Sequence, residues 1–253
     1  SAASDVYKRQ VTLVVCAPGY PGSTAEAQPA MDALAAAVAA AAGWQPGELR
    51  AVYHEAEEAG LVRLAQPDAA VTLVPLPFWL KHRAALGLAP RLQAIQQGGE
   101  IAEAWSLVVP AAAGARPSDL AGYQVLSLAG YAPRFVRGPV LGEWGTLPPD
   151  VTIRFSQAVL SGLRKASAGA KVAVLLDRAQ AAALPSLPYA AKLKVATRSR
   201  PLPVAVLCTV GERMPAARRA ALVKALAALG SRPGEMDVLA GVRMRRFVAV
   251  DQQ

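Results

Sequence analysis

Short, nearly uninterrupted apolar runs constrain this chain more than any other feature of its sequence. The first is VTLVVCA at Val11–Ala17, and the same character returns in AAVTLV at 69–74 and KVAVLL at 171–176. Runs of this kind are typical of parallel strands that are covered on both faces. Alanine-rich and leucine-rich stretches with helical periodicity lie between them. The sequence therefore predicts an α/β protein.

The same reading places further elements along the chain. Strands are expected at Leu49–Tyr53, Trp105–Val109, 124–129, 151–155, 193–210 (interrupted by SRPLP) and 246–250. Helices are expected to end at Ala42 and to cover 157–167, 178–184 and 215–229.

The charge of the chain is unevenly distributed. The formal net charge is +9, and 12 basic against 4 acidic residues fall between Ala112 and Val204, which leaves 15 basic and 14 acidic residues elsewhere. A net charge of +8 in one segment biases its field toward an anionic ligand or an acidic partner. A generally arginine-rich surface would give the same count. The length of 253 residues allows two lobes, and no apolar run reaches the roughly 20 residues that a membrane span needs.

Motifs for several function classes are absent from the sequence. Zinc-finger, RNA-recognition and basic-helix patterns do not occur, so no nucleic-acid partner is expected. The chain also lacks Gly-x-Ser-x-Gly, His-Glu-x-x-His, paired cysteines and GxGxxG. Its two histidines, His54 and His82, are interpreted as a solvated loop residue and an exposed helix residue. The sequence predicts binding without catalysis, cofactor or metal.

The two cysteines, Cys16 and Cys208, lie inside apolar strand-like runs. A disulfide between them requires their strands to be neighbours. Buried free thiols are the favoured interpretation, because a thiol in such a run behaves as a small hydrophobic side chain.

The segment Ser118–Gly138, SDLAGYQVLSLAGYAPRFVRG, contains the first candidate site. A helix-start signal and a strand at 124–129 precede a loop that holds Tyr131, Arg134 and Arg137. Ligand contacts in α/β proteins lie at the carboxyl ends of strands, so this loop is expected to bind a ligand. The arginines would supply charge-assisted hydrogen bonds.

Two other strand ends offer candidate contacts. After the first strand, PGYPGST places Tyr20, Ser23 and Thr24 before a helix whose free N–H groups favour anions, although an ordinary helix cap explains the same residues. After the third strand, Phe78 and Trp79 are expected to pack on a ligand or to fill the core.

Asp177 follows the apolar run at 171–176 and has two interpretations. It could accept a ligand hydrogen bond or pair with Arg134 or Arg178. It could also serve as the N-cap of the next helix, which is the favoured interpretation.

The order of these elements resembles a known family. SLVVP at 106–110, a short break, SDLAG and a new strand are similar to the type II periplasmic solute-binding proteins, and closest to the phosphate, phosphonate and sulfonate group of ABC-transporter proteins. Phosphonate binders usually carry a Ser/Thr-Ser-Gly run after that strand, whereas this chain has LAGYAPRFVRG. The resemblance therefore bears on the fold more directly than on the ligand.

The resemblance implies a two-lobed α/β fold with a hinge of two crossing segments. Lobe 1 would comprise 11–110 and 204–253, lobe 2 would be inserted at 111–203, and 198–203 would form part of the hinge. The first ten residues, SAASDVYKRQ, are interpreted as a non-native remnant, so that the native N-terminus and any signal peptide are missing.

The function implied is that of a solute-binding component of an ABC transporter. It would bind a small anionic or polar, phosphonate-like solute between two lobes and act, as a monomer, with a membrane permease. A periplasmic or lipid-anchored extracytoplasmic location follows. The alternative is a cytoplasmic enzyme on the same fold, similar to chorismate dehydratase or to thiamine-pyrimidine synthases.

Overall fold

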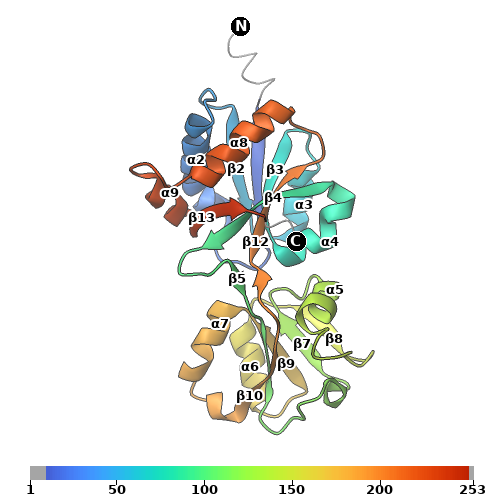
Figure 1. Cartoon of the computed structure of the whole chain (residues 1–253). Helices are drawn as coiled ribbons and strands as arrows, with labels where there is room; N and C mark the ends of the chain where they lie inside the picture. The colour runs from blue at the N-terminus through green and yellow to red at the C-terminus, as the bar shows by residue number, and fades with distance from the viewer. Residues whose placement is uncertain (1–9, 251–253) are drawn as a thin grey trace. The chain divides into compact units, whose positions relative to one another are not determined.

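The computed structural model describes residues 10–250 (Figure 1). Residues 1–9 of the expected N-terminal remnant lie outside the described part. The chain forms two compact units: unit 1 contains the chain up to Ile101 and from Pro203 onward, and unit 2 is Ala102–Leu202. The chain therefore passes from one unit to the other twice.

Unit 1 is built on a six-stranded sheet with the order β13-β4-β12-β3-β1-β2. Its strands are β1 (Val11–Cys16), β2 (Leu49–His54), β3 (Ala69–Pro75), β4 (Leu88–Gln96), β12 (Ala205–Val210) and β13 (Met244–Ala249). β1 pairs in parallel with both β2 and β3, and β12 lies antiparallel between β3 and β4. The apolar runs at 11–17 and 69–74 thus form neighbouring parallel strands, as the sequence predicts.

Helices cover both faces of this sheet. They are α2 (Thr24–Ala41), α3 (Glu57–Leu64), α4 (Leu76–Leu86), α8 (Ala216–Ala228) and α9 (Glu235–Gly241). Leu13 and Val15 belong to the core that packs on α2, α8 and α9. The alternate residues, Val14 and Cys16, are also fully buried. Burial of both faces explains why the strand is apolar at every position.

Unit 2 contains a five-stranded sheet with the order β10-β6-β9-β7-β8. Its strands are β6 (Ser106–Pro110), β7 (Gln124–Ser127), β8 (Thr152–Phe155), β9 (Val172–Leu176) and β10 (Leu193–Arg198). Its longer helices are α6 (Val159–Ser167) and α7 (Arg178–Ala183). Leu163 and Ala166 of α6 pack on Val108 and Val174, which forms the core on one face.

Short helical segments complete unit 2. They are α5 (Pro133–Phe135), the π-helical turn η2 (Val136–Val140) and the 3-10 turns η1 (Pro117–Leu120), η3 (Leu184–Ser186) and η4 (Ala190–Lys192). The sequence predicts a loop after residue 129, whereas the structure forms helical turns at Pro133–Phe135 and Val136–Val140. Phe135 and Val136, both buried, anchor this segment in unit 2.

Two short strands lie on the connecting segments. β5 (Ala102–Glu103) and β11 (Leu202–Pro203) pair as a two-stranded sheet. Beside them, the Trp105 N–H donates to the Ser199 hydroxyl at 2.9 Å, and the Ser199 N–H donates to the Trp105 carbonyl at 2.9 Å. The two crossings are thus joined to each other by backbone and side-chain hydrogen bonds.

The expectation of two free thiols is confirmed. Cys16 and Cys208 are both buried and unpaired. They lie on β1 and β12, which are separated by β3 in the sheet order. Burial raises the pKa of each thiol to about 12, so both remain protonated at neutral pH.

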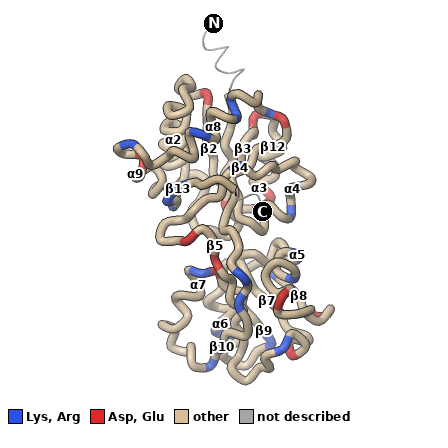
Figure 2. Tube along the Cα trace, viewed as in Figure 1, with Lys and Arg blue, Asp and Glu red and all other residues tan. Residues whose placement is uncertain are grey.

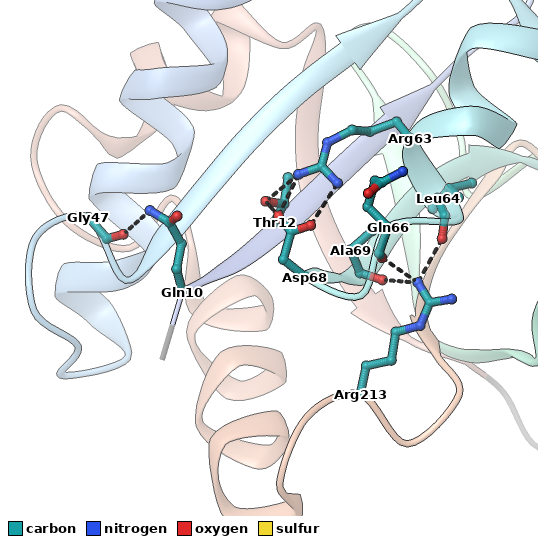
Figure 3. A network of polar contacts seen from close by, with 9 residues as sticks. All are labelled: Gln10, Thr12, Gly47, Arg63, Leu64, Gln66, Asp68, Ala69 and Arg213. Atoms are coloured by element: carbon teal, nitrogen blue, oxygen red, sulfur yellow. Dashed lines mark hydrogen bonds and ion pairs between the residues drawn. The ribbon is translucent and has the colours of Figure 1, made fainter. Parts of the chain in front are cut away.

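A polar network closes the amino end of the central strands (Figure 3). The Arg63 guanidinium donates to Asp68 at 2.5 and 3.0 Å and to the Thr12 hydroxyl at 2.8 Å. The Thr12 hydroxyl also donates to Asp68 at 2.6 Å. These donors lower the pKa of Asp68 to about 2.

A second arginine donates hydrogen bonds to backbone carbonyls at the same end of the sheet. Nη1 of Arg213 donates to the carbonyls of Leu64, Gln66 and Ala69 at 2.7, 2.9 and 2.9 Å (Figure 3). Leu64 is the last residue of α3, and the carbonyls at a helix end need external donors. Arg213 therefore joins the end of α3 to the turn after β12.

Candidate functional site

The carboxyl ends of the strands in unit 1 share one edge of the sheet. β1, β2 and β3 are parallel neighbours, so the turns after Cys16, His54 and Pro75 lie at this edge. Ala205, the first residue of β12, pairs with Pro75. The connecting segments therefore attach to unit 1 at the edge that an α/β protein uses for ligand contacts.

Ser23 caps α2, as one interpretation of the sequence predicts. Its hydroxyl accepts the Glu26 N–H at 3.2 Å, and the Glu26 carboxylate accepts the Ser23 N–H at 2.8 Å. This reciprocal capping box lowers the pKa of Glu26, because the backbone N–H of Ser23 favours its charged form. The start of α2 already carries a carboxylate, which disfavours an anion there.

The other two residues predicted in this turn are held less tightly. The Tyr20 carbonyl accepts a hydrogen bond from the Tyr53 hydroxyl at 3.2 Å, and the Thr24 hydroxyl lies 3.4 Å from the Glu55 carboxylate. Tyr20 and Thr24 are both partly exposed. They remain candidate ligand contacts.

The two predicted aromatic residues at the start of α4 lie in different environments. Phe78 is fully buried and is part of the core. Trp79 is half-buried, its indole N–H lies 3.4 Å from the Leu88 carbonyl, and the Arg83 guanidinium stacks on its ring at 4.7 Å. Trp79 therefore remains the aromatic candidate.

The histidine interpretations are wrong. His54 is the last residue of β2, it is partly buried, and its Nε2 is a buried atom with no hydrogen-bond partner among the described residues. Burial lowers the pKa of His54. His82 is 14% exposed, and its Nε2 lies 2.7 Å from the Glu57 carboxylate. Lys81 pairs with the same carboxylate at 2.7 Å, so these residues form a packed polar cluster between α3 and α4.

Unit 2 repeats this arrangement with its own strands. β7 pairs in parallel with β8 and β9, so the turns after Ser127, Phe155 and Leu176 share an edge. Ser106, where β6 begins, pairs with both Leu176 and Arg198. The connecting segments thus attach to unit 2 at its carboxyl edge as well.

The turn after β7 passes very close to the backbone of β8. A Cβ atom on Gly130 would overlap the carbonyl of Arg154 and the backbone nitrogen of Phe155. Glycine is therefore required at this position. The rings of Tyr131 and Phe155 meet edge to face at 6.1 Å, which places Tyr131 at this same edge.

The two predicted arginines of this segment have different surroundings. Arg137 donates to the Val151 carbonyl at 2.6 Å and lies 3.5 Å from the carbonyls of Leu147 and Pro148. Its guanidinium therefore holds the 147–151 segment against η2. Arg134 is exposed, so its side chain is accessible to a ligand.

Asp177 caps α7, which confirms the favoured interpretation. Its carboxylate accepts the Gln180 N–H at 2.8 Å, and its own N–H donates to the Gln180 side chain at 3.1 Å. Beside it, the Glu103 carboxylate accepts the Arg178 N–H at 3.2 Å. Both carboxyl groups belong to residues that are only 7% exposed.

Backbone donors at two helix starts were not singled out from the sequence. α4 and α6 have no side-chain cap and no acidic residue in their first turns, and they follow β3 and β8 at the two carboxyl edges. At α4 the Leu76 N–H already donates to the Val204 carbonyl at 3.1 Å and Pro77 has no N–H, so the start of α6 is the better candidate for donating N–H groups to an anion. The sequence signal is the absence of a capping residue at the two N-cap positions, which are Pro75 and Ala158.

Two cavities of unit 1 lie away from these edges. One, of about 390 Å³, is lined by alanines of α2 and α8 together with Lys224 and Arg232, and the other, of about 330 Å³, lies beside Trp44. None of the nine predicted site residues lines either cavity. Within residues 10–250, no cluster of three or more potential metal ligands is found. No helix in that range is both long and apolar enough to cross a membrane.

The comparisons with known proteins identify the fold. No family model and no curated protein matches the chain. XAC2383 from Xanthomonas citri bound to chloride ion is similar, with a TM-score of 0.70 and 14% identity over 95% of this chain and 92% of that chain. The binding protein component of an ABC phosphonate transporter from Pseudomonas aeruginosa has a TM-score of 0.63 and 12% identity over 96% and 82%. PhnD1 from Prochlorococcus marinus in complex with methylphosphonate has a TM-score of 0.61 and 12% identity over 95% and 93%.

These similarities, with sheets and helices in two compact units, define the class of fold. It is the two-lobed α/β fold of the type II periplasmic binding proteins, as the sequence resemblance implies. At 12–14% identity the similarity establishes the fold and leaves the ligand open.

Proposed function

We propose that this protein is the solute-binding component of an ABC transporter and that its ligand is a small anionic or polar solute of the phosphonate or oxyanion class. One observation carries the proposal: in each unit, parallel strands end at the edge to which the connecting segments attach. The nine predicted residues, Tyr20, Ser23, Thr24, Phe78, Trp79, Tyr131, Arg134, Arg137 and Asp177, all follow strands that end at these two edges.

Charge and helix orientation support an anionic group on the ligand. Unit 2 carries 12 basic and 5 acidic residues, a net charge of +7, whereas unit 1 has 15 basic and 13 acidic residues (Figure 2). Arg134 supplies an accessible guanidinium, and the start of α6, which has no side-chain cap, is proposed to donate N–H groups. Solved relatives of this fold include a phosphonate transporter component and a methylphosphonate complex, which agrees with this ligand class. A membrane permease is the partner that such a role requires, and an extracytoplasmic location follows from it.

The environments of the nine residues divide them into two sets. Ser23, Phe78, Arg137 and Asp177 are engaged in caps, core packing or backbone contacts, so they are proposed to shape the turns. Tyr20, Thr24, Trp79, Tyr131 and Arg134 are proposed to contact the solute.

A thermal-shift screen tests the proposal. Phosphate, alkylphosphonates, sulfonates and amino acids are added separately, and a solute at about 100 times its Kd should stabilise the protein by about 2.7 kcal/mol. Arg134→Met is expected to weaken binding of the positive solute at least tenfold, measured by calorimetry, while the unliganded melting temperature stays unchanged. If no member of the panel shifts the melting temperature at millimolar concentration, the binding role is contradicted.

A further inference from the structure

A pair of buried carboxyl groups lies beside the first connecting segment. Glu103 is on β5, which pairs with β11 of the second connecting segment. Asp177 lies at the junction of β9 and α7. β6 and β9 pair from Ser106 and Leu176, so Asp177 directly follows the last paired residue of β9 and Glu103 precedes the first paired residue of β6 by three positions.

The hydrogen bonds of the pair attach the connecting strand to unit 2. The Glu103 carboxylate accepts the N–H of Arg178, which is the first residue of α7, at 3.2 Å. Asp177 turns its carboxylate to the Gln180 N–H of the same helix at 2.8 Å. Two acidic side chains therefore share the amino end of one short helix.

The charged groups around Glu103 act in opposite senses. Burial raises its pKa first, the negative charge of Asp177 raises it further, and the Arg178 N–H and guanidinium lower it, with a result of about 7. Burial also raises the pKa of Asp177. On the second connecting segment, Arg200 pairs with the exposed Glu143 at 3.3 Å. The cost of placing two negative charges in this buried position thus exceeds the gain from the donors.

We propose that Glu103 and Asp177 form a proton-binding pair that fastens the first connecting strand to α7, and that loss of the proton loosens this attachment as the pH rises. The protonated Glu103 carboxyl is neutral and tolerates burial beside Asp177. The ionised carboxylate is repelled by Asp177 and gains hydration when it leaves this position. Because Glu103 is on a connecting strand, its protonation state regulates the segment about which the two units are joined. This inference does not depend on the identity of the solute.

The sign of the stability effect follows from the raised pKa. A group that binds its proton more tightly in the folded state stabilises that state below its unfolded pKa of about 4.3, and this contribution is lost as the pH rises through about 7. Glu103→Gln mimics the protonated form. The variant should match the wild type in stability at pH 4 and increasingly exceed it as the pH rises to 8.5.

Carbon-13 NMR of the Glu103 carboxyl tests the pair directly in the full chain. Its titration midpoint is expected at about 7 in the wild type. Asp177→Asn keeps a capping side chain and removes the neighbouring charge, so the midpoint should fall while staying above the ordinary glutamate value. A wild-type midpoint near 4.3 would overturn the proposal, whether or not the variants fold.

Amide hydrogen exchange tests the attachment itself. After correction for intrinsic exchange, protection of the Arg178 N–H should be about tenfold lower at pH 8 than at pH 6 in the wild type, since about nine-tenths of Glu103 is ionised one unit above its midpoint. Glu103→Gln should remove this difference. Glu143→Gln is the matched control, because it makes the same substitution at a side chain that is 71% exposed, and it should behave as the wild type. An identical pH profile in wild type and Glu103→Gln would refute the proton-dependent attachment.

Discussion

Two acidic side chains, one in each unit, have pKa values that are shifted in opposite directions. Asp68 in unit 1 receives two donors from Arg63 and one from Thr12, and its pKa falls to about 2. Glu103 in unit 2 shares its position with Asp177, and its pKa rises to about 7. The same functional group thus shifts in opposite directions, because the neighbouring charges and donors decide which form is stable.

The two carboxyl groups also differ in their position in the fold, and this difference bears on their roles. Asp68 is at the amino edge of its sheet, where Arg213 also donates hydrogen bonds to backbone carbonyls (Figure 3). Glu103 is at the connecting strands. A permanently charged and well-paired group rigidifies the first region, whereas a group that titrates near neutral pH makes the second region responsive. Four predictions sharpen this contrast.

The largest effect is expected at Arg213. Arg213→Met leaves the carbonyls of Leu64, Gln66 and Ala69 without their shared donor and should lower the free energy of unfolding by about 2–3 kcal/mol, measured by urea denaturation at pH 7. Arg219→Met is the control. Its partner Glu212 is 88% exposed, so a change within about 0.5 kcal/mol is expected. Equal losses in the two variants would contradict the role of the carbonyl contacts.

Arg137 is the counterpart of Arg213 in unit 2. Its guanidinium makes one short contact with a backbone carbonyl and two long ones. Arg137→Met should cost about 1–2 kcal/mol in the free energy of unfolding, because the Val151 carbonyl loses its donor. Solute affinity measured below the melting transition should change less than twofold, in contrast with Arg134→Met. A large loss of affinity with no loss of stability would instead assign Arg137 to the ligand.

The pH dependence of Asp68 should mirror that of Glu103. A depressed pKa contributes stability that is present above the unfolded value of about 3.9 and lost as the pH falls through about 2. The side chain is 39% exposed, so Asp68→Asn should cost only about 1 kcal/mol at pH 7 and clearly less at pH 2, where about half of Asp68 is protonated. Urea midpoints at the two pH values provide the measurement. A cost that persists unchanged in acid would show that charge is not involved.

Asp177→Ala is expected to have, at acidic pH, an effect as small as that of Asp68→Asn at pH 7, and a smaller one at pH 8. Loss of the cap should cost about 1 kcal/mol at pH 5.5, where Glu103 is protonated. At pH 8 the same change also relieves repulsion with ionised Glu103, so the cost should be smaller. The comparison requires thermal melts at both pH values. A larger cost at pH 8 would mean that Asp177 stabilises the ionised form.

Local features of the structure were predictable from sequence. The apolar runs became β1, β3 and β9, and Ser23 and Asp177 cap helices as their positions indicate. Such features depend on residues within a few positions of one another, so periodicity and capping preferences are sufficient. The sequence does not indicate β4, because Pro90 lies inside it and proline is rare within a strand that pairs on both sides.

The environment of each side chain was harder to predict from the sequence. Arg134 and Arg137 looked equivalent in the sequence, yet one is exposed and the other holds backbone carbonyls. His82 was expected to be exposed and instead contacts Glu57 on another helix. These outcomes depend on which helices and strands pack together. The local sequence does not indicate which elements those are.

The sequence by itself determined an α/β chain with buried parallel strands, the ends of its main helices and the resemblance to type II binding proteins. Tertiary structure alone decided the strand order, the donors that reach Asp68 and the meeting of Glu103 with Arg178, which is 75 positions away in the chain. The physical reason is the separation along the chain of the residues that interact. Helix caps and strand periodicity arise among neighbouring residues, whereas burial and the electrostatic environment of a carboxyl group exist only when distant segments exclude water together.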